Sequence, residues 1–237
     1  MTSAAIKGIL FDKDGTLIDV IATWLPVYRE MLAEAFPGRE SHWDSVMQKS
    51  GFEPQSNTFK ANSMLAAGTT DQLVDLWWPG LDAGERRRRI ERVDDDFKNK
   101  STRYLRSLVP LKELFGELRA RGLKLGVATN DNERSARSHV ALLGVEHLVD
   151  FVAGYDSVSR AKPAGDMVHA FCGACGLSPN EVAVIGDNLH DMEMGRDAGA
   201  GLVVGVLSGN SRREDFGTIA DAVLESVADL PRFLDRR

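Results

Sequence analysis

Cysteine is scarce in this 237-residue sequence, which contains two, Cys172 and Cys175. Their C-x-x-C spacing can indicate a redox centre or half of a metal site. A structural zinc ion needs four ligands, and the sequence offers no second cysteine pair and only His169 nearby. Because both cysteines continue an apolar stripe with helical spacing, we expect them to pack as small hydrophobic residues.

Long apolar runs and excess positive charge are also missing. No run is long enough to cross a bilayer as a helix. The N-terminal segment does not follow a signal-peptide pattern, because Asp12 and Asp14 interrupt its apolar stretch. Acidic residues, 35, outnumber basic residues, 29, which leaves no electrostatic footprint for nucleic acid. We therefore expect a cytoplasmic protein that acts on a small molecule and binds neither membranes nor nucleic acid.

Short β-branched runs that alternate with amphipathic helical patterns dominate the rest of the chain. Apolar runs of this kind are typical of parallel strands buried on both faces. Their alternation with helices predicts right-handed βαβ units in a doubly wound, Rossmann-like parallel α/β sheet. The predicted strands cover residues 6–11, 123–129, 148–154, 182–186 and 202–206, and the clearest helices cover 111–121, 133–143 and 167–175.

The segment between the first two predicted strands, residues 18–104, shows no convincing strand pattern. Helical spacing of apolar residues predicts helices near 21–35 and 90–108, and Pro26 must either kink the first helix or begin a new one. The segment is far too long for a βα connection, so it predicts an inserted all-helical domain. Residues 1–17 and 105–237 then form the sheet domain, and residues 18–104 the insertion.

Polar residues follow the predicted strands at the edge where open α/β sheets bind ligands. Four carboxylates in one cleft need a compensating cation, because like charges shift one another's pKa values. Oxygen ligands without cysteine or histidine favour Mg²⁺, and Mg²⁺ beside a lysine and a hydroxyl suits a phosphoryl group. The candidate residues are Asp12, Asp14, Thr129, Asn130, Lys162, Asp187 and Asp191.

Four of these stretches resemble, in order and spacing, the motifs of the haloacid dehalogenase (HAD) superfamily. They are "DKDGTL", the strand end at Thr129, the pair Lys162-Pro163 and "GDNLHD". The insertion matches the position of the C1 helical cap of that superfamily, and "GDNLHDMEMGRDAGAG" is similar to the phosphoglycolate phosphatase group. The pattern departs at "KPAGD", where Gly165 replaces a proline. The resemblance implies a Mg²⁺-dependent phosphatase that hydrolyses a small phosphomonoester through an aspartyl-phosphate.

The same resemblance implies roles for the individual residues. Asp12 would be the nucleophile, and Asp14 would protonate the leaving alkoxide and later deprotonate water. Mg²⁺ would contact the Asp12 carboxylate, the Asp14 backbone carbonyl and Asp187. Asp191 would support the site through water or through Lys162. The phosphoryl group would be held by Thr129, Asn130 and Lys162.

Lys13 and His190 lie inside the motifs without an implied role. Strand alternation predicts that Lys13 points away from the catalytic face, so we expect its amine at the surface or toward a nearby carboxylate rather than on the phosphate. We expect His190 to be structural rather than a substrate contact. The loop-like stretch 51–64 is a candidate for substrate contacts.

Other reactions fit parts of this pattern. A hydrolytic dehalogenase needs no second acid, so Asp14 favours phosphoryl transfer. A sugar phosphatase or a phosphomutase uses the same core, whereas a phosphonatase needs a cap lysine that forms a Schiff base. A receiver-like phospho-Asp signalling module shares these residue types but is shorter. The pattern leaves open the physiological substrate and the choice between a monomer and a homodimer.

Overall fold

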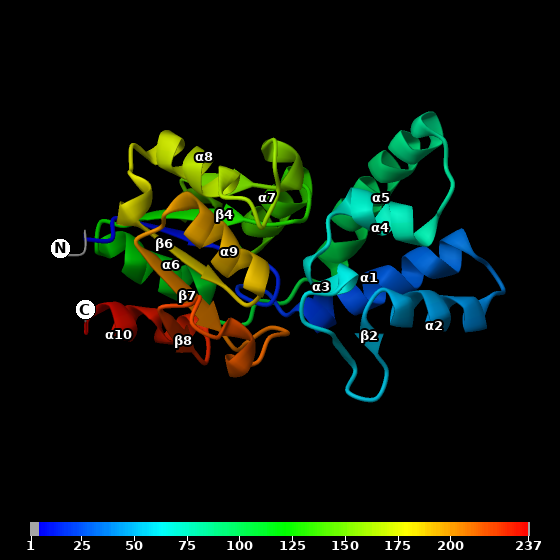
Figure 1. Cartoon of the computed structure of the whole chain (residues 1–237), viewed down its shortest axis with the longest axis horizontal. Helices are drawn as coiled ribbons and strands as arrows, with labels where there is room; N and C mark the ends of the chain where they lie inside the picture. The colour runs from blue at the N-terminus through cyan, green and yellow to red at the C-terminus, as the bar shows by residue number, and fades with distance from the viewer. Residues whose placement is uncertain (1–4, 237) are drawn as a thin grey trace.

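The computed structural model describes residues 5–236 and divides into two lobes that lie side by side. Figure 1 shows a sheet covered by helices in one lobe and a group of helices in the other. Each lobe encloses its own buried apolar core. Within the described residues, no helix combines the length and the apolar character that a membrane crossing requires.

The first lobe contains a sheet of six parallel strands. These are β1 (Gly8–Phe11), β4 (Lys124–Ala128), β5 (Phe151–Ala153), β6 (Val182–Gly186), β7 (Leu202–Val206) and β8 (Ala222–Leu224). Their order is β5-β4-β1-β6-β7-β8, and every neighbouring pair is parallel. After β1, the chain adds β4 and β5 on one side of that strand and then β6, β7 and β8 on its other side. The switch point where such sheets bind ligands therefore lies beside β1.

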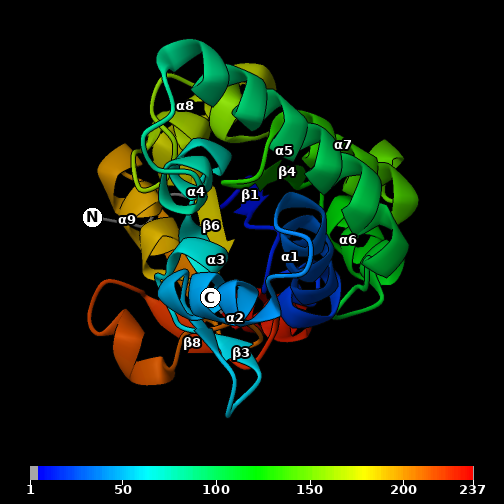
Figure 2. The same cartoon turned by 90° about the vertical axis from the view of Figure 1, so that its right-hand side faces the viewer.

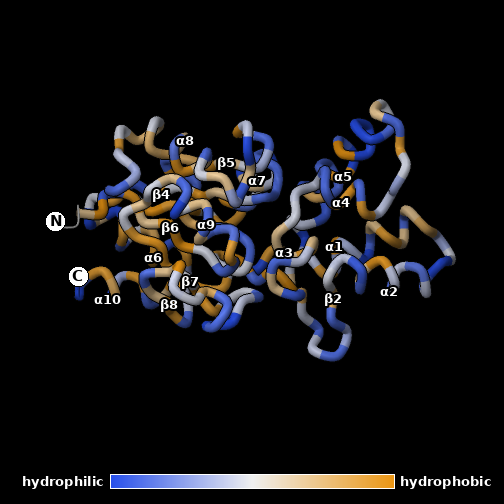
Figure 3. Tube along the Cα trace, in the orientation of Figure 1, coloured by the Kyte–Doolittle hydropathy of each residue, from blue (hydrophilic) through white to orange (hydrophobic). Residues whose placement is uncertain are grey.

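Helices cover both faces of this sheet, which explains why its strands are apolar throughout. Ile9 and Phe11 of β1 join the core on one face, whereas Leu10 joins the core on the other. Figure 3 shows the apolar character concentrated along β6 and β7. The first face is covered by α6 (Leu111–Ala120), α7 (Glu133–Leu142) and α10 (Leu230–Leu234), and the second by α8 (Asp166–Cys175) and α9 (Leu189–Ala198).

The predicted doubly wound α/β sheet is confirmed, with differences at its margins. The strand predicted at 148–154 is confined to β5, because a 3₁₀ turn occupies Glu146–Leu148. The edge strand β8 was not predicted, since its three half-buried residues are too few to show a period. Both cysteines lie in α8 as free thiols, Cys172 buried and Cys175 partly buried.

The second lobe is formed by the segment between β1 and α6. Its helices are α1 (Val20–Ala35), α2 (Glu40–Lys49), α3 (Met64–Ala67), α4 (Thr70–Trp77) and α5 (Ala83–Tyr104). Pro26 lies within one continuous α1, so the alternative of a new helix beginning there is wrong. The expectation that this segment holds no strand is also wrong, because β2 (Phe52–Glu53) and β3 (Thr58–Phe59) form a small antiparallel hairpin. Two-residue strands carry no detectable alternation.

The two lobes are joined along α5 and α7, which lie side by side in Figure 2. The Ser101 hydroxyl of α5 lies 2.6 Å from Nε2 of His139 in α7. Asp94 of α5 accepts hydrogen bonds from Thr70 in α4 and from the Asn132 amide that precedes α7. These buried and partly buried polar contacts hold the helical lobe over the carboxyl ends of the strands.

Candidate active site

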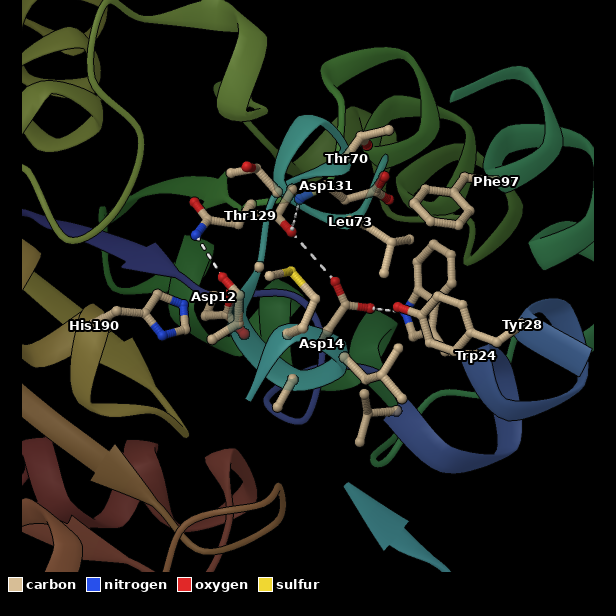
Figure 4. Close-up of a pocket in the computed structure, with 18 residues that line it drawn as sticks. Asp12, Asp14, Trp24, Tyr28, Thr70, Leu73, Phe97, Thr129, Asp131 and His190 are labelled. Carbon is tan, nitrogen blue, oxygen red and sulfur yellow. Dashed lines mark hydrogen bonds between the residues drawn. The ribbon is translucent and has the colours of Figure 1, made fainter. Parts of the chain in front are cut away.

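A cleft between the two lobes opens over the carboxyl ends of β1 and β4 (Figure 4). Asp12 and Asp14 at the end of β1 line its floor together with Thr129 and Asn130 after β4. Helices α1, α3, α4 and α5 supply the opposite wall. The sheet topology therefore brings together residues that are more than one hundred positions apart in the sequence.

Three buried carboxylates form a cluster at this floor. One oxygen from each of Asp12, Asp187 and Asp191 lies within 4.8 Å of the others. The amine of Lys162 lies 2.6 Å from Asp12 Oδ1 and 2.6 Å from Asp191 Oδ1. Lys162 enters from the loop before α8, while Asp187 follows β6 and Asp191 lies in the first turn of α9. One lysine thus faces three acids.

The electrostatics of this cluster suit a divalent cation. Burial, reinforced by the charges of Asp191 and Asp14, raises the pKa of Asp12 to about 6. Burial raises the pKa of Asp187 well above its ordinary value, and Asp12 and Asp191 add to the effect. Burial alone would lower the pKa of the Lys162 amine, but the charges of Asp12 and Asp191 outweigh this effect and raise it. The negative charge exceeds what one lysine neutralises, and an all-oxygen donor set of this kind fits Mg²⁺.

Glycines make room for the cluster. Gly15 has a φ of +84°, and a Cβ there would lie 2.5 Å from Asp187 Oδ2. A Cβ at Gly209 would lie 1.9 Å from the same oxygen. The backbone can approach the Asp187 carboxylate this closely only without a side chain. This close approach accounts for the glycine that follows the two acids in "DKDGTL".

Asp14 points away from the cluster, toward the helical lobe. Its carboxylate accepts hydrogen bonds from the Trp24 indole of α1 and from the Thr129 hydroxyl, the latter at 3.2 Å. Burial alone would raise the pKa of Asp14, but Lys13 and Trp24 hold it below the usual value. The metal contact that the resemblance implies for Asp14 uses the backbone carbonyl, so it does not depend on the direction of this side chain.

Lys13 is buried, with 1% of its surface exposed. Its amine lies 2.6 Å from Asp14 Oδ2 and 3.3 Å from Asp131 Oδ2, and 5.1 Å from the Trp24 ring centre. The expected carboxylate partner is confirmed. Lys13 does not belong to the described lining of the cleft, but its amine lies on the side of Asp14 and not on the opposite side that strand alternation predicts. The reason is that β1 ends at Phe11, so the alternation does not continue to residue 13.

Sequence reasoning missed Asp131, whose only signal was its place at the end of "VATND". Burial and the nearby Asp14 charge raise the pKa of Asp131 to about 6, even though Lys13 opposes them. Asp131 also accepts a hydrogen bond from the backbone N–H of Asn132, at 2.8 Å. Asp131, Lys13 and Asp14 thus form a second charged group, in which Asp14 and Asp131 line the cleft and Lys13 lies behind them.

Asn130 and His190 both line the cleft. The Asn130 amide donates to the Ala67 carbonyl of α3 at 2.8 Å, and its Oδ1 is buried without a partner among the described residues. His190 Nε2 lies 3.5 Å from Asp191 Oδ1. Burial and the Lys162 charge lower the pKa of His190 to about 3, so the ring is neutral. Figure 4 shows His190 beside Asp12 at the cleft.

The stretch 51–64 contributes one residue to the lining, Met64. The polar side chains of this stretch, such as Lys60, lie outside the cleft lining. Lys60 is exposed and lies 3.8 Å from Glu53 of the hairpin. The residues of the helical lobe that line the cleft instead come from its helices and from the turn between α3 and α4.

Comparison with known proteins places this site in a family. A model of the haloacid dehalogenase-like hydrolases matches residues 6–199. The chain is 26% identical to N-acetylmuramic acid 6-phosphate phosphatase from Pseudomonas aeruginosa over 100% of its length and 98% of that protein. It is also 26% identical to a phosphoglycolate phosphatase from Yersinia pestis, over 95% of this chain and 92% of that protein.

A solved structure shares the fold. A haloacid dehalogenase-like hydrolase from Bacteroides fragilis superposes with a TM-score of 0.74 at 18% identity, covering 95% of this chain and 99% of that one. The family match spans β1, the inserted helices and the strand ends that carry the acidic cluster. The chain belongs to the haloacid dehalogenase-like hydrolase family.

Proposed function

We propose that this hydrolase is a Mg²⁺-dependent phosphatase that cleaves a small phosphomonoester through an aspartyl-phosphate on Asp12. The observation that supports this most is the cluster of Asp12, Asp187 and Asp191 around Lys162 at the switch point of the sheet. The relatives named phosphatases support the same reaction class.

In the first step, the Asp12 carboxylate oxygen that Lys162 does not hold attacks phosphorus in line. A bond forms between that oxygen and phosphorus, and the ester bond to the leaving group breaks. Lys162 neutralises phosphoryl oxygens and fixes the orientation of the Asp12 carboxylate. Thr129 and Asn130 lie beside the acids and would donate hydrogen bonds to the same oxygens. Mg²⁺, bound by Asp12 and Asp187, would supply charge neutralisation for the transferring group.

Asp14 acts first as the general acid and then as the general base. In the first step, the leaving alkoxide takes a proton from Asp14. In the second step, Asp14 takes a proton from the water that attacks phosphorus, the bond between phosphorus and the Asp12 oxygen breaks, and phosphate leaves while Asp12 returns to its carboxylate form. The contacts from Lys13 and Trp24 favour the ionised form that this second step needs. The negative charge of an incoming phosphate raises the pKa of Asp14 and so favours the protonated form that the first step needs.

A phosphonatase has less support. That reaction requires a lysine in the helical lobe that faces the substrate. No lysine belongs to the described lining of the cleft. Lys13 lies behind the floor of the cleft and is held by two carboxylates.

Phosphate release from p-nitrophenyl phosphate tests the proposal. We expect release that depends on Mg²⁺, stops with EDTA and falls by at least ~10³-fold in Asp12→Asn, because the nucleophile is lost. Asp44→Asn, at an exposed acid in α2, is the matched control and should retain full activity. Undiminished activity in Asp12→Asn would contradict the mechanism.

A further inference from the structure

The wall of the cleft that faces the reacting phosphate is apolar. Trp24 and Tyr28 of α1 and Phe97 of α5 form an aromatic cluster, with ring centres 5.1 to 5.9 Å apart. Leu73 of α4 stands beside them in Figure 4. The remaining apolar side chains of this wall are Val20, Met64, Leu65, Ala66 and Ala67. A leaving group that enters the cleft therefore meets hydrocarbon and aromatic surface.

No lysine or arginine side chain lies in this wall among the described lining residues. The histidine of the lining, His190, lies beside Asp12 on the sheet side of the cleft and not in this wall. Two lysines lie near the cleft, and each of them already pairs with two carboxylates. Lys162 holds Asp12 and Asp191, and Lys13 holds Asp14 and Asp131.

Three of the polar side chains on this side of the cleft already donate to carboxylates of the protein. The Trp24 indole donates to Asp14, and the Thr70 hydroxyl donates to Asp94 at 2.7 Å. The N-terminus of α4 would favour an anion, but the Thr69 hydroxyl there donates to Asp71, an acid of the first turn. Burial raises the pKa of Tyr28, so its hydroxyl stays uncharged.

An anionic leaving group would bind weakly in this cleft. Its charge would lose hydration against the aromatic cluster and would gain no cationic partner from the described lining. It would also approach Asp14 and Asp131, which are acids of the same sign. A neutral group with an apolar face meets none of these penalties and buries surface on entry.

Building on the phosphatase function proposed above, we infer that the substrate is the phosphate monoester of an uncharged alcohol with an apolar or aromatic face. Esters whose leaving group carries a carboxylate, such as 2-phosphoglycolate, are discriminated against.

A matched pair of esters tests this inference. The values of kcat/KM for 2-phosphoglycolate and for its neutral amide, carbamoylmethyl phosphate, isolate the charge because the two differ little in size. We expect the amide to be preferred by ~10- to 100-fold, because the carboxylate would be desolvated without a compensating cation. Phenyl phosphate, which matches the aromatic wall, should be hydrolysed at least as well as the amide.

A pair of variants locates the effect. Leu73→Lys places a cation in the wall and should shift the ratio at least ~10-fold toward 2-phosphoglycolate, because it supplies the missing partner. Leu76→Lys, on the exposed face of the same helix, should leave the ratio unchanged. The wild-type comparison stands even if Leu73→Lys does not fold.

The possible failures are distinguishable. Equal or better hydrolysis of 2-phosphoglycolate by the wild-type enzyme, with p-nitrophenyl phosphate also cleaved, would overturn this inference and leave the phosphatase proposal standing. Absence of hydrolysis for every ester, p-nitrophenyl phosphate included, would overturn both.

Discussion

Lys13 shows how one residue can join the catalytic floor to its support. A fully buried amine is tolerated only with close partners, and Lys13 has Asp14 on one side and Asp131 on the other. The Trp24 ring adds a cation–π contact from the helical lobe. These contacts fix the side chain of the proposed acid–base residue Asp14, which makes Lys13 a positioning residue.

Replacement of Lys13 by methionine should therefore destabilise the protein. Two carboxylates would remain buried without their cation, so we expect the free energy of unfolding to fall by ~3–5 kcal/mol in urea denaturation. Lys60→Met, at an exposed lysine, should change it by less than ~0.5 kcal/mol. A Lys13→Met variant as stable as the wild type would show that the pairings contribute nothing.

For single residues, the sequence predicted those whose order and spacing form motifs. The structure brings Asp12, Asp187 and Lys162 of these motifs together. The sequence did not predict Asp131 as the partner of Lys13. That pairing joins the ends of two strands, and it depends on where β1 stops. A shift of one residue in the end of a strand reverses the direction in which a side chain is expected to point.

Among the elements, the turn after β1 carries the strictest requirement. Gly15 combines a left-handed backbone with close approach to Asp187. Gly15→Ala should therefore lower both the stability and the Mg²⁺-dependent activity, because a Cβ would strain the turn and push Asp187 aside. Gly116→Ala in α6 is the control, since a Cβ there meets nothing and the backbone is helical. We expect it to raise the free energy of unfolding by ~0.5–1 kcal/mol. Equal effects in the two variants would contradict this account.

The junction between α5 and α7 should respond to pH through His139. Burial and the Lys13 charge lower the pKa of this histidine from 6.5 to about 3 in the folded protein. The unfolded chain therefore binds the proton more readily, and stability falls as the pH drops from 6.5 toward 3. Between pH 7 and pH 5, we expect the wild type to lose ~1–2 kcal/mol more than His139→Gln.

Urea denaturation of both proteins at the two pH values measures this difference. Acids with raised pKa values, such as Asp12 and Asp131, act in the opposite direction, but they are common to both proteins and cancel. Parallel pH profiles would mean that His139 is not held neutral at the junction of α5 and α7.

Long, strongly patterned elements of the fold were predictable, and short ones were not. Strands such as β6 and β7 are buried along their whole length and so form uninterrupted apolar runs. The hairpin of β2 and β3 and the edge strand β8 contain two or three residues each, and they form because tertiary contacts favour them. Local pattern cannot reveal such elements.

In the whole molecule, two separate cores meet at a cleft with unlike walls. The sheet lobe contributes carboxylates, Lys162 and hydrogen-bond donors, and the helical lobe contributes the aromatic cluster. The proposed reaction chemistry could be inferred from the sequence because the residues assigned to it lie in short motifs at the strand ends. The substrate-facing wall could not, because it is assembled from residues scattered over four helices whose spacing only indicates a core.

The central claim is that Asp12 becomes covalently phosphorylated. The most direct measurement is rapid acid quenching of the Asp14→Asn variant during turnover of p-nitrophenyl phosphate with Mg²⁺, followed by peptide mass spectrometry. Loss of the base at position 14 should slow the second step, so the peptide containing Asp12 is expected to gain the mass of one phosphoryl group. Phosphate release without any such peptide, or a phosphoryl group on another residue, would contradict the account.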